Sequence, residues 1–405
     1  MKIARFISKR ISHQEKGSFS TTISKIVVGS VASGLFIVLI SYAILLGFQR
    51  NIKQKIFSFG GHIILTKYDL NSSLFENPIT VNKEFIAKCI NMSNVASINT
   101  FSNKAGLIKT ESEVQGAVLK GVDDNFNPKL FSKNLIKGRF IRFGDSTGSK
   151  EIVVSKKTAA KLLLDTGQTI TIFFVQNPPR FRKLKVVGIF STGLDEFDES
   201  VMLGDIKLIQ KINNWDSTKA GGYEISLKNF EFLDQTADAI FANMDYDLGL
   251  EKITDKHITI FDWLVLLDQN VRIFLILILA VASFNMVSGL FIMIMERTQM
   301  IGLLKALGAS NGQVRNIFFL NALRLIVYGL LLGNMAAAAF CFVQWHFGLL
   351  PLDPENYYMD TVPIEWDWQI WLLANAGLFI IMSLTVLIPN MVISNIQPVK
   401  AIRFD

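Results

Sequence analysis

Residues 273–309 read IFLILILAVASFNMVSGLFIMIMERTQMIGLLKALGA, an apolar run that passes directly into a short amphipathic segment. The run from Ile273 to Met295 has no charged residue, and Arg272 and Glu296 flank it. A transmembrane helix needs about 20 consecutive, mostly apolar residues. The stretch therefore predicts a membrane-spanning helix that ends in a segment at the membrane surface.

Three further stretches have the same character, at residues 26–49, 325–352 and 368–393, although the apolar part of the second ends near residue 347 and Asp353 and Glu355 follow it. Buried helices of a large soluble protein are the alternative, but charge-free runs of this length are typical of membrane spans. We therefore predict an α-helical membrane protein with four transmembrane helices and a large mixed α/β domain inserted between helices one and two. The helices are assigned to residues 26–49, 271–295, 316–346 and 368–393, and the domain to residues 50–270.

Lysine and arginine residues, which favour the cytoplasmic side of a membrane, set the orientation. They are present in the N-terminal segment 1–25, in the loop 296–315 and in the tail 394–405, whereas the loop 347–367 has none. The three basic segments are predicted to be cytoplasmic, and the inserted domain and the loop 347–367 to lie outside. Within the first segment, residues 2–14 have the spacing of an amphipathic helix on the inner membrane surface, with a disordered basic tail as the alternative.

The net charge of +7 requires no nucleic-acid partner, because much of it belongs to tails that would face anionic lipid. The first span follows a long polar segment, which favours a signal anchor over a cleavable signal peptide. Cys89 belongs to the inserted domain and Cys341 to span three, so we expect no disulfide.

The inserted domain alternates strand-like and helical patterns. Runs rich in β-branched and aromatic residues, such as 114–120 and 184–190, predict strands. Apolar spacing at residues 230–243 predicts a helix, and glycine or proline pairs mark the turns between elements. This interleaving predicts a mixed α/β domain, built either as one lobe or as two.

Motifs for catalysis are missing from the sequence. The segment Gly144–Glu151 comes nearest to a nucleotide-binding loop, but it lacks the spacing Gly-x-x-x-x-Gly-Lys-Ser/Thr and precedes a strand. None of the four histidines has a metal-binding spacing with a cysteine or another histidine. We therefore expect a non-catalytic chain that binds no metal or cofactor itself.

The segment after Met295 has the pattern of a short helix joined to span three by a tight corner. Gly308 lies where a helix ends, because glycine takes the left-handed cap without steric cost. Ser310 and Gln313 have the spacing of a capping box, which predicts that a second helix begins at once. A force applied to this segment would be transmitted to both neighbouring spans. The alternative is an ordinary cytoplasmic loop.

The string Glu296-Arg297-Thr298-x-x-Ile301-Gly302-x-x-Lys305-Ala306-x-Gly308-Ala309 resembles the signature of FtsX-like permeases, the membrane subunits of certain ABC transporters. In that family this segment is the coupling helix, which docks on a partner ATPase. The resemblance implies two ATPase copies, which bind the ATP and Mg that this chain does not. The implied coupling residues are Glu296, Arg297, Ile301, Gly302, Lys305, Ala306, Gly308 and Ala309.

Other segments resemble the lipoprotein-releasing LolC/LolE branch of this family, next to MacB-like permeases. They are Leu46-Gly47-Phe48-Gln49-Arg50, Tyr358-Met-Asp360-x-x-Pro363-Ile364 and Ile396-Gln-Pro398-x-x-Ala401-Ile402-Arg403. The resemblance implies a multi-pass protein of the bacterial inner membrane that extracts lipoproteins and delivers them to a periplasmic carrier. It also implies a second permease subunit, as a homodimer or a related heterodimer.

Two further sets of residues follow from this resemblance. A lipid or lipoprotein cavity would lie between spans one and two, and a periplasmic hairpin would contact the carrier; the hairpin is short compared with the projecting hook of LolC. The cavity residues are Phe36, Ile40, Ile44, Phe48, Phe274 and Ile278, for which ordinary packing or lipid contact is the alternative. The hairpin residues are Pro178, Pro179, Arg180 and Phe181.

Two other functions fit the architecture. One is a MacB-like efflux or mechanotransmission permease, although this chain has no fused ATPase. The other is an FtsX-like signalling module that controls cell-wall hydrolases, whose outer domain is usually smaller than this one. Neighbouring genes for an ATPase alone, an adaptor or a hydrolase would separate these functions.

Overall fold

The computed structural model describes residues 19–68, 76–109, 113–144, 148–353, 357 and 359–395. The predicted amphipathic helix at residues 2–14 and the Lol-like segment 396–403 lie outside these ranges. The chain forms two compact units. We call residues 1–49, 263–351 and 361–405 the helical unit, and residues 50–262 and 352–360 the sheet unit.

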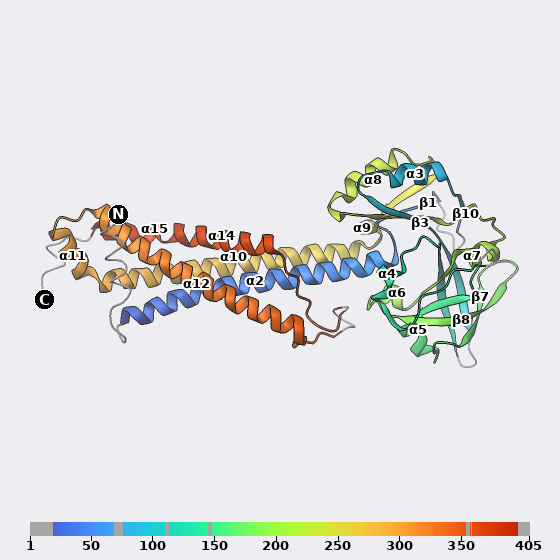
Figure 1. The fold of residues 1–405 in the computed structure, drawn as a ribbon, viewed down its shortest axis with the longest axis horizontal. Coiled ribbons are helices and arrows are strands. Elements are labelled where there is room, and N and C mark those ends of the chain that lie inside the picture. Colours follow the sequence, from blue (N-terminus) through green and yellow to red (C-terminus); the bar gives the residue numbers. More distant parts are fainter. Residues whose placement is uncertain are drawn as a thin grey trace. The chain divides into compact units, whose positions relative to one another are not determined.

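Four helices in the described ranges are long and apolar enough to cross a membrane (Figure 1). They are α2 (Phe19–Phe59), α10 (Ile258–Glu296), α12 (Asn311–Phe347) and α14 (Trp368–Thr385), which α15 (Leu387–Val392) and η2 (Ile393–Asn395) continue. Each contains the apolar part of one charge-free stretch, the fourth together with its continuation in α15 and η2. The first two extend well beyond those stretches, so that the last turns of α2 and the first turns of α10 belong to the sheet unit.

The helical unit packs around α2. Val27, Val31, Leu35 and Leu39 repeat at helical spacing, are fully buried, and share one core with residues of α10, α12 and α14. On α12, Gly329 lies so close to α2 that a Cβ atom there would come within 2.7 Å of the Val31 side chain. Small residues allow this approach in membranes, where close packing rather than water exclusion holds helices together.

The sheet unit interleaves strands and helices, as the sequence pattern predicts. Its main sheet has the strand order β12-β1-β11-β3-β4-β9-β6-β8-β5, and β7 pairs with β3 and β8. The strands are β1 (Ile63–Lys67), β3 (Val95–Lys109), β4 (Val114–Val122), β5 (Leu135–Gly138), β6 (Glu151–Ser155), β7 (Thr169–Phe174), β8 (Arg180–Phe190), β9 (Val201–Asp205), β11 (Gly222–Leu227) and β12 (Leu248–Lys252), while β2 (Ile79–Thr80) and β10 (Lys219–Ala220) form a separate pair.

Short helices cover this sheet. They are α3 (Lys83–Ile90), α4 (Pro128–Ser132), α5 (Lys156–Lys161), α6 (Asp195–Asp198), α7 (Ile206–Asn213), η1 (Phe230–Phe232), α8 (Leu233–Phe241) and α9 (Ile253–Lys256). Asn82 caps α3 through hydrogen bonds from Glu84 N and Phe85 N, and Asp205 caps α7 through a bond from Lys207 N.

Strand β3 joins two separate cores of the sheet unit. Its first half pairs with β11, where Ile98 packs in a core with Phe85 and Tyr223. Its second half pairs with β4 and β7, where Ile108 packs in a core with Leu119 and others. Strand β4 pairs only with residues 101–109 of β3. On the edge that faces β4, residues 95–100 of β3 therefore have no neighbouring strand among the described residues.

Candidate functional site

The segment predicted to be the coupling helix is helical and forms α11 (Thr298–Ala306), which begins directly after α10 ends. Ile301 at its centre is fully buried in a cluster with Ile294 of α10, Val314 and Phe318 of α12, and Ile393 of η2. Burying a side chain of this size stabilises the packed state by about 1.5–3 kcal/mol. The helix is therefore held against the ends of three membrane helices.

The corner after α11 has the geometry that the sequence predicts. Gly308 has φ of +92°, and its N–H donates to the Lys305 carbonyl at 3.0 Å, while Ala309 N–H donates to the Leu304 carbonyl at 3.0 Å. This pair of bonds is the Schellman arrangement that closes a helix end. Ser310 and Gln313 form the capping box in both directions, so α12 begins at Asn311.

Lys305 has an inward contact that the sequence did not indicate. Its Nζ donates to the carbonyl oxygens of Ile393 at 2.7 Å and Ser394 at 3.4 Å, which ties α11 to η2. Partial burial lowers the pKa of this amine. Lys305 lies one helical turn after the buried Ile301, so both residues belong to the inner face of α11.

The outer face of α11 has two exposed leucines together with the exposed Gln299. Leu303 is 54% exposed and Leu307 is 77% exposed, and both lie on the side away from Ile301. Of the predicted coupling residues, Glu296, Ala306 and Gly308 are exposed, Arg297, Lys305 and Ala309 are half-buried, and Ile301 and Gly302 are buried. Leu303 was not identified from the sequence as a surface residue. Leu303 and Leu307 are four residues apart and therefore share one helix face, whereas Ile301, two residues before Leu303, lies on the opposite face; this spacing could have indicated the exposure of Leu303.

Two of the Lol-like segments contact each other in the helical unit. The Glu365 N–H donates to the Ala43 carbonyl of α2 at 3.1 Å. One turn later, Gly47 lies so near the Pro363 carbonyl that a Cβ atom would come within 2.7 Å of its oxygen. Only glycine permits this approach without displacing the backbone of the segment before α14.

The predicted cavity residues have different surroundings. Phe36 and Ile40 are half-buried against the core around α2, and the ring of Phe36 lies 6.1 Å from that of Phe340 on α12. Ile44 and Ile278 are half-buried, whereas Phe274 is 65% exposed. Phe48 is buried, with its ring 5.4 Å from that of Trp263 on α10. These residues therefore include both packed and exposed positions along α2 and α10.

The predicted carrier-contact hairpin is the turn between β7 and β8. Arg180 fixes its base, because its Nη1 donates to the Ile212 carbonyl at 2.7 Å and to Asn214 Oδ1 at 2.8 Å, at the end of α7. Pro178 and Pro179 are exposed in the turn. Phe181 is 57% exposed, and its ring lies 5.9 Å from that of Phe173 across the hairpin. The hairpin is thus a short, anchored turn with an aromatic pair beside it.

Comparisons with known proteins cover nearly the whole chain. The model of the FtsX-like permease C-terminal domain matches residues 272–398, and that of the MacB-like periplasmic core domain matches residues 24–240, more than half of the chain. LolC, a lipoprotein-releasing system transmembrane protein of Neisseria meningitidis, is 22% identical over 97% of this chain and 96% of its own length. LolE of Haemophilus influenzae is 22% identical over 98% of both chains.

Among solved structures, the periplasmic region of MacB from Actinobacillus actinomycetemcomitans matches 52% of this chain and 97% of its own, with 12% identity and a TM-score of 0.35. The family models, together with the four apolar helices, assign the sheet unit to a large periplasmic domain and the chain to a membrane protein. The chain belongs to the FtsX/MacB-like family of ABC transporter permeases, and its relatives include LolC and LolE.

Proposed function

We propose that this chain is a permease subunit that couples ATP hydrolysis by a separate ATPase to the release of lipoproteins from the inner membrane. The observation that supports the proposal is the extent of the likeness to LolC and LolE, which covers 97% and 98% of this chain, respectively. The contact between Gly47 and Pro363 supports it, because it joins two segments that resemble this branch.

In this proposal the ATPase docks on the outer face of α11. Leu303 and Leu307 supply apolar surface there, and Glu296 lies exposed beside it. Inward displacement of α11 would act on α10, α12 and η2 together, since Ile301 and Lys305 connect it to their ends. Two ATPase subunits, which hold the ATP and Mg, and a second permease copy or homologue would complete the complex.

The cargo and the carrier would act at the opposite side of the membrane. Exposed apolar side chains of α10, including Phe274, would face the acyl chains, and the short β7–β8 turn would contact a soluble periplasmic carrier. Phe48 packs on Trp263 in this structure, so lipid could reach it only if the ends of α2 and α10 separated.

The test is reconstitution of the chain with its ATPase in proteoliposomes that contain an acylated lipoprotein. We expect ATP-dependent release of the lipoprotein to an added carrier. Leu303→Asp combined with Leu307→Asp should abolish release and ATPase recovery, while Leu349→Asp, at a residue that is 64% exposed outside α11, should not. Failure to release lipoprotein, with ATP-dependent export of a small molecule or activation of a hydrolase instead, would favour the MacB-like or FtsX-like function.

A further inference from the structure

The free edge of β3 in the sheet unit has backbone groups without partners among the described residues. The Phe101 carbonyl accepts from Gly221 N–H on the β11 side. Thr100 N–H, one residue earlier, points to the opposite edge, where it donates to Asp123 Oδ2 at 2.7 Å. Residues two apart on a strand direct their N–H and C=O groups to the same edge, so Ile98 also faces this side. No described strand pairs with Ile98 there.

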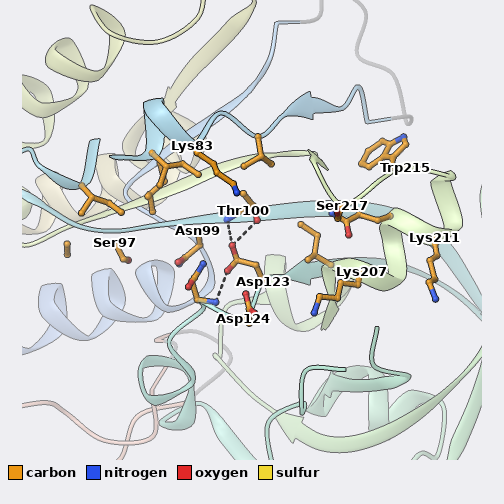
Figure 2. Close-up of a pocket in the computed structure, with 18 residues that line it drawn as sticks. Lys83, Ser97, Asn99, Thr100, Asp123, Asp124, Lys207, Lys211, Trp215 and Ser217 are labelled. Atoms are coloured by element: carbon orange, nitrogen blue, oxygen red, sulfur yellow. Dashed lines mark hydrogen bonds between the residues drawn. The ribbon is translucent and has the colours of Figure 1, made fainter. Parts of the chain in front are cut away.

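A cleft of about 910 Å³ follows this edge (Figure 2). Its lining includes Ile98 and Thr100, whose side chains lie on one face of β3, and Ser97 and Asn99, whose side chains lie on the other. A single cleft reaches both faces of a strand only by passing around its unpaired edge. Helices α3 and α7 supply the walls, and Trp215 lies at one end.

The chemistry of the cleft suits a polypeptide in extended conformation. The Asp123 carboxylate, which accepts from both Thr100 N–H and Thr100 Oγ1, already takes the place that the carbonyl of an added strand would have. Asn99 Oδ1 is buried in the cleft lining without a hydrogen-bond partner among the described residues. Lys83 and Lys211 are exposed on the two helical walls, whereas Asp123 and Asp124 also line the cleft, so an acidic side chain would be favoured only next to one of the lysines.

We propose that this cleft binds an extended segment of the lipoprotein cargo by adding it as a strand to β3, an inference that rests on the proposed function. Backbone pairing with Ile98 would supply affinity that does not depend on cargo sequence. Residues 96–99, before the Thr100 N–H that Asp123 occupies, present about 13 Å of edge, enough for about four cargo residues. An acidic cargo side chain would contact Lys83 or Lys211.

The first experiment places a photo-crosslinking amino acid at Ser217, an exposed residue of the cleft, in the full chain reconstituted with its ATPase. The probe is an acylated model lipoprotein with an extended acidic segment after its lipid anchor. We expect a crosslink within that segment, and none from Tyr246, which is fully exposed elsewhere on the sheet unit. A crosslink to the carrier or to a second copy of the chain, or no crosslink, would overturn the assignment of the cargo.

The second experiment measures binding of a fluorescent hexapeptide, Thr-Val-Glu-Val-Asp-Thr, to the full chain in detergent. N-methylation of the amides on one edge of this peptide should weaken binding at least tenfold, whereas N-methylation on the other edge should change it less than twofold. Lys83→Glu with Lys211→Glu should weaken binding about fivefold, and the matched change Lys228→Glu should leave it unchanged. Equal affinities of the two N-methylated peptides would exclude strand addition.

These readouts separate the two proposals. Lipoprotein release without a crosslink from Ser217 would overturn the cleft assignment and leave the proposed function standing. Edge-specific peptide binding by a chain that releases no lipoprotein would overturn the proposed function, and with it the cargo as occupant.

Discussion

Substitution of Gly308 by valine tests whether the corner after α11 transmits force. The residue has φ of +92°, and no atom beyond its two chain neighbours lies within 4 Å of the position that a Cβ would take. The substitution therefore introduces no clash with a neighbour, and its cost is the backbone strain of a β-branched residue in a left-handed conformation. Such strain is worth about 1–3 kcal/mol, and valine belongs near the upper end.

This strain is comparable to the net stability of the corner. The capping box contributes about 1 kcal/mol, the hydrogen bonds from the Lys305 amine about 2 kcal/mol, and the burial of Ile301 about 2 kcal/mol. Ordering the four residues 307–310 costs roughly 1 kcal/mol each at the low end of the range. The remaining margin of about 1 kcal/mol is smaller than the strain, so Gly308→Val should open the corner while the membrane helices stay inserted.

The assay compares lipoprotein released per ATP hydrolysed in proteoliposomes, at equal membrane content of each variant. Gly308→Val should lower this ratio about tenfold or more, and Gly308→Asn, which tolerates the left-handed region, less than threefold. Gly312→Val is the matched control, because Gly312 has equally open surroundings without a positive φ. Normal coupling in Gly308→Val, or an equal loss in Gly312→Val, would refute the reasoning.

Three further predictions concern other contacts. Lys305→Met should loosen η2 from α11 and lower coupling more than Lys305→Arg, which can still donate to the same carbonyls; equal losses in a release assay would contradict this role. Gly329→Leu should lower the melting temperature of the full chain in detergent by 5 °C or more, because the leucine side chain would clash with α2. Gly377→Leu is the control and should shift the melting temperature little, because the space around Gly377 is open. Burial lowers the pKa of His62 to about 4, so the unfolded chain binds more protons than the folded chain between pH 4 and 6.5. The free energy of unfolding should therefore fall, by on the order of 3 kcal/mol, as the pH drops through that window, and His62→Asn should remove most of this slope in urea titrations at a series of pH values.

The elements predicted well from sequence are those whose signals are local. Charge-free runs mark the four membrane helices, because a missing charge is a property of the segment itself. The corner at Gly308 follows from two short-range rules, the left-handed cap and the capping box, and both are present. The continuation of α2 to Phe59 has a local cause as well, since Gly60 and Gly61 are the first helix-breaking residues after the apolar run.

The features that escaped prediction depend on residues distant in sequence. Lys305 bonds to carbonyls 88 and 89 residues later, and no periodicity in α11 indicates where those carbonyls lie. The close approach of Gly47 to Pro363 likewise joins residues that lie far apart in the sequence. The open edge of β3 results from the place where β4 stops pairing, which depends on the strand order of the whole sheet.

The inward contact of Lys305 bears on the proposed docking of an ATPase on α11. A signature with Glu296, Arg297 and Lys305 suggests recognition by charge, yet the lysine amine is bonded to η2 and the exposed face consists mainly of Leu303 and Leu307. Apolar contact carries little directional information, so a rigid presentation of the helix must supply the specificity. The Schellman bonds and the capping box, separated only by Ala309, supply that rigidity. In the proposed docking, the features that fix the outer face of α11 would therefore also carry its displacement to α12, and a looser corner would weaken recognition and transmission together.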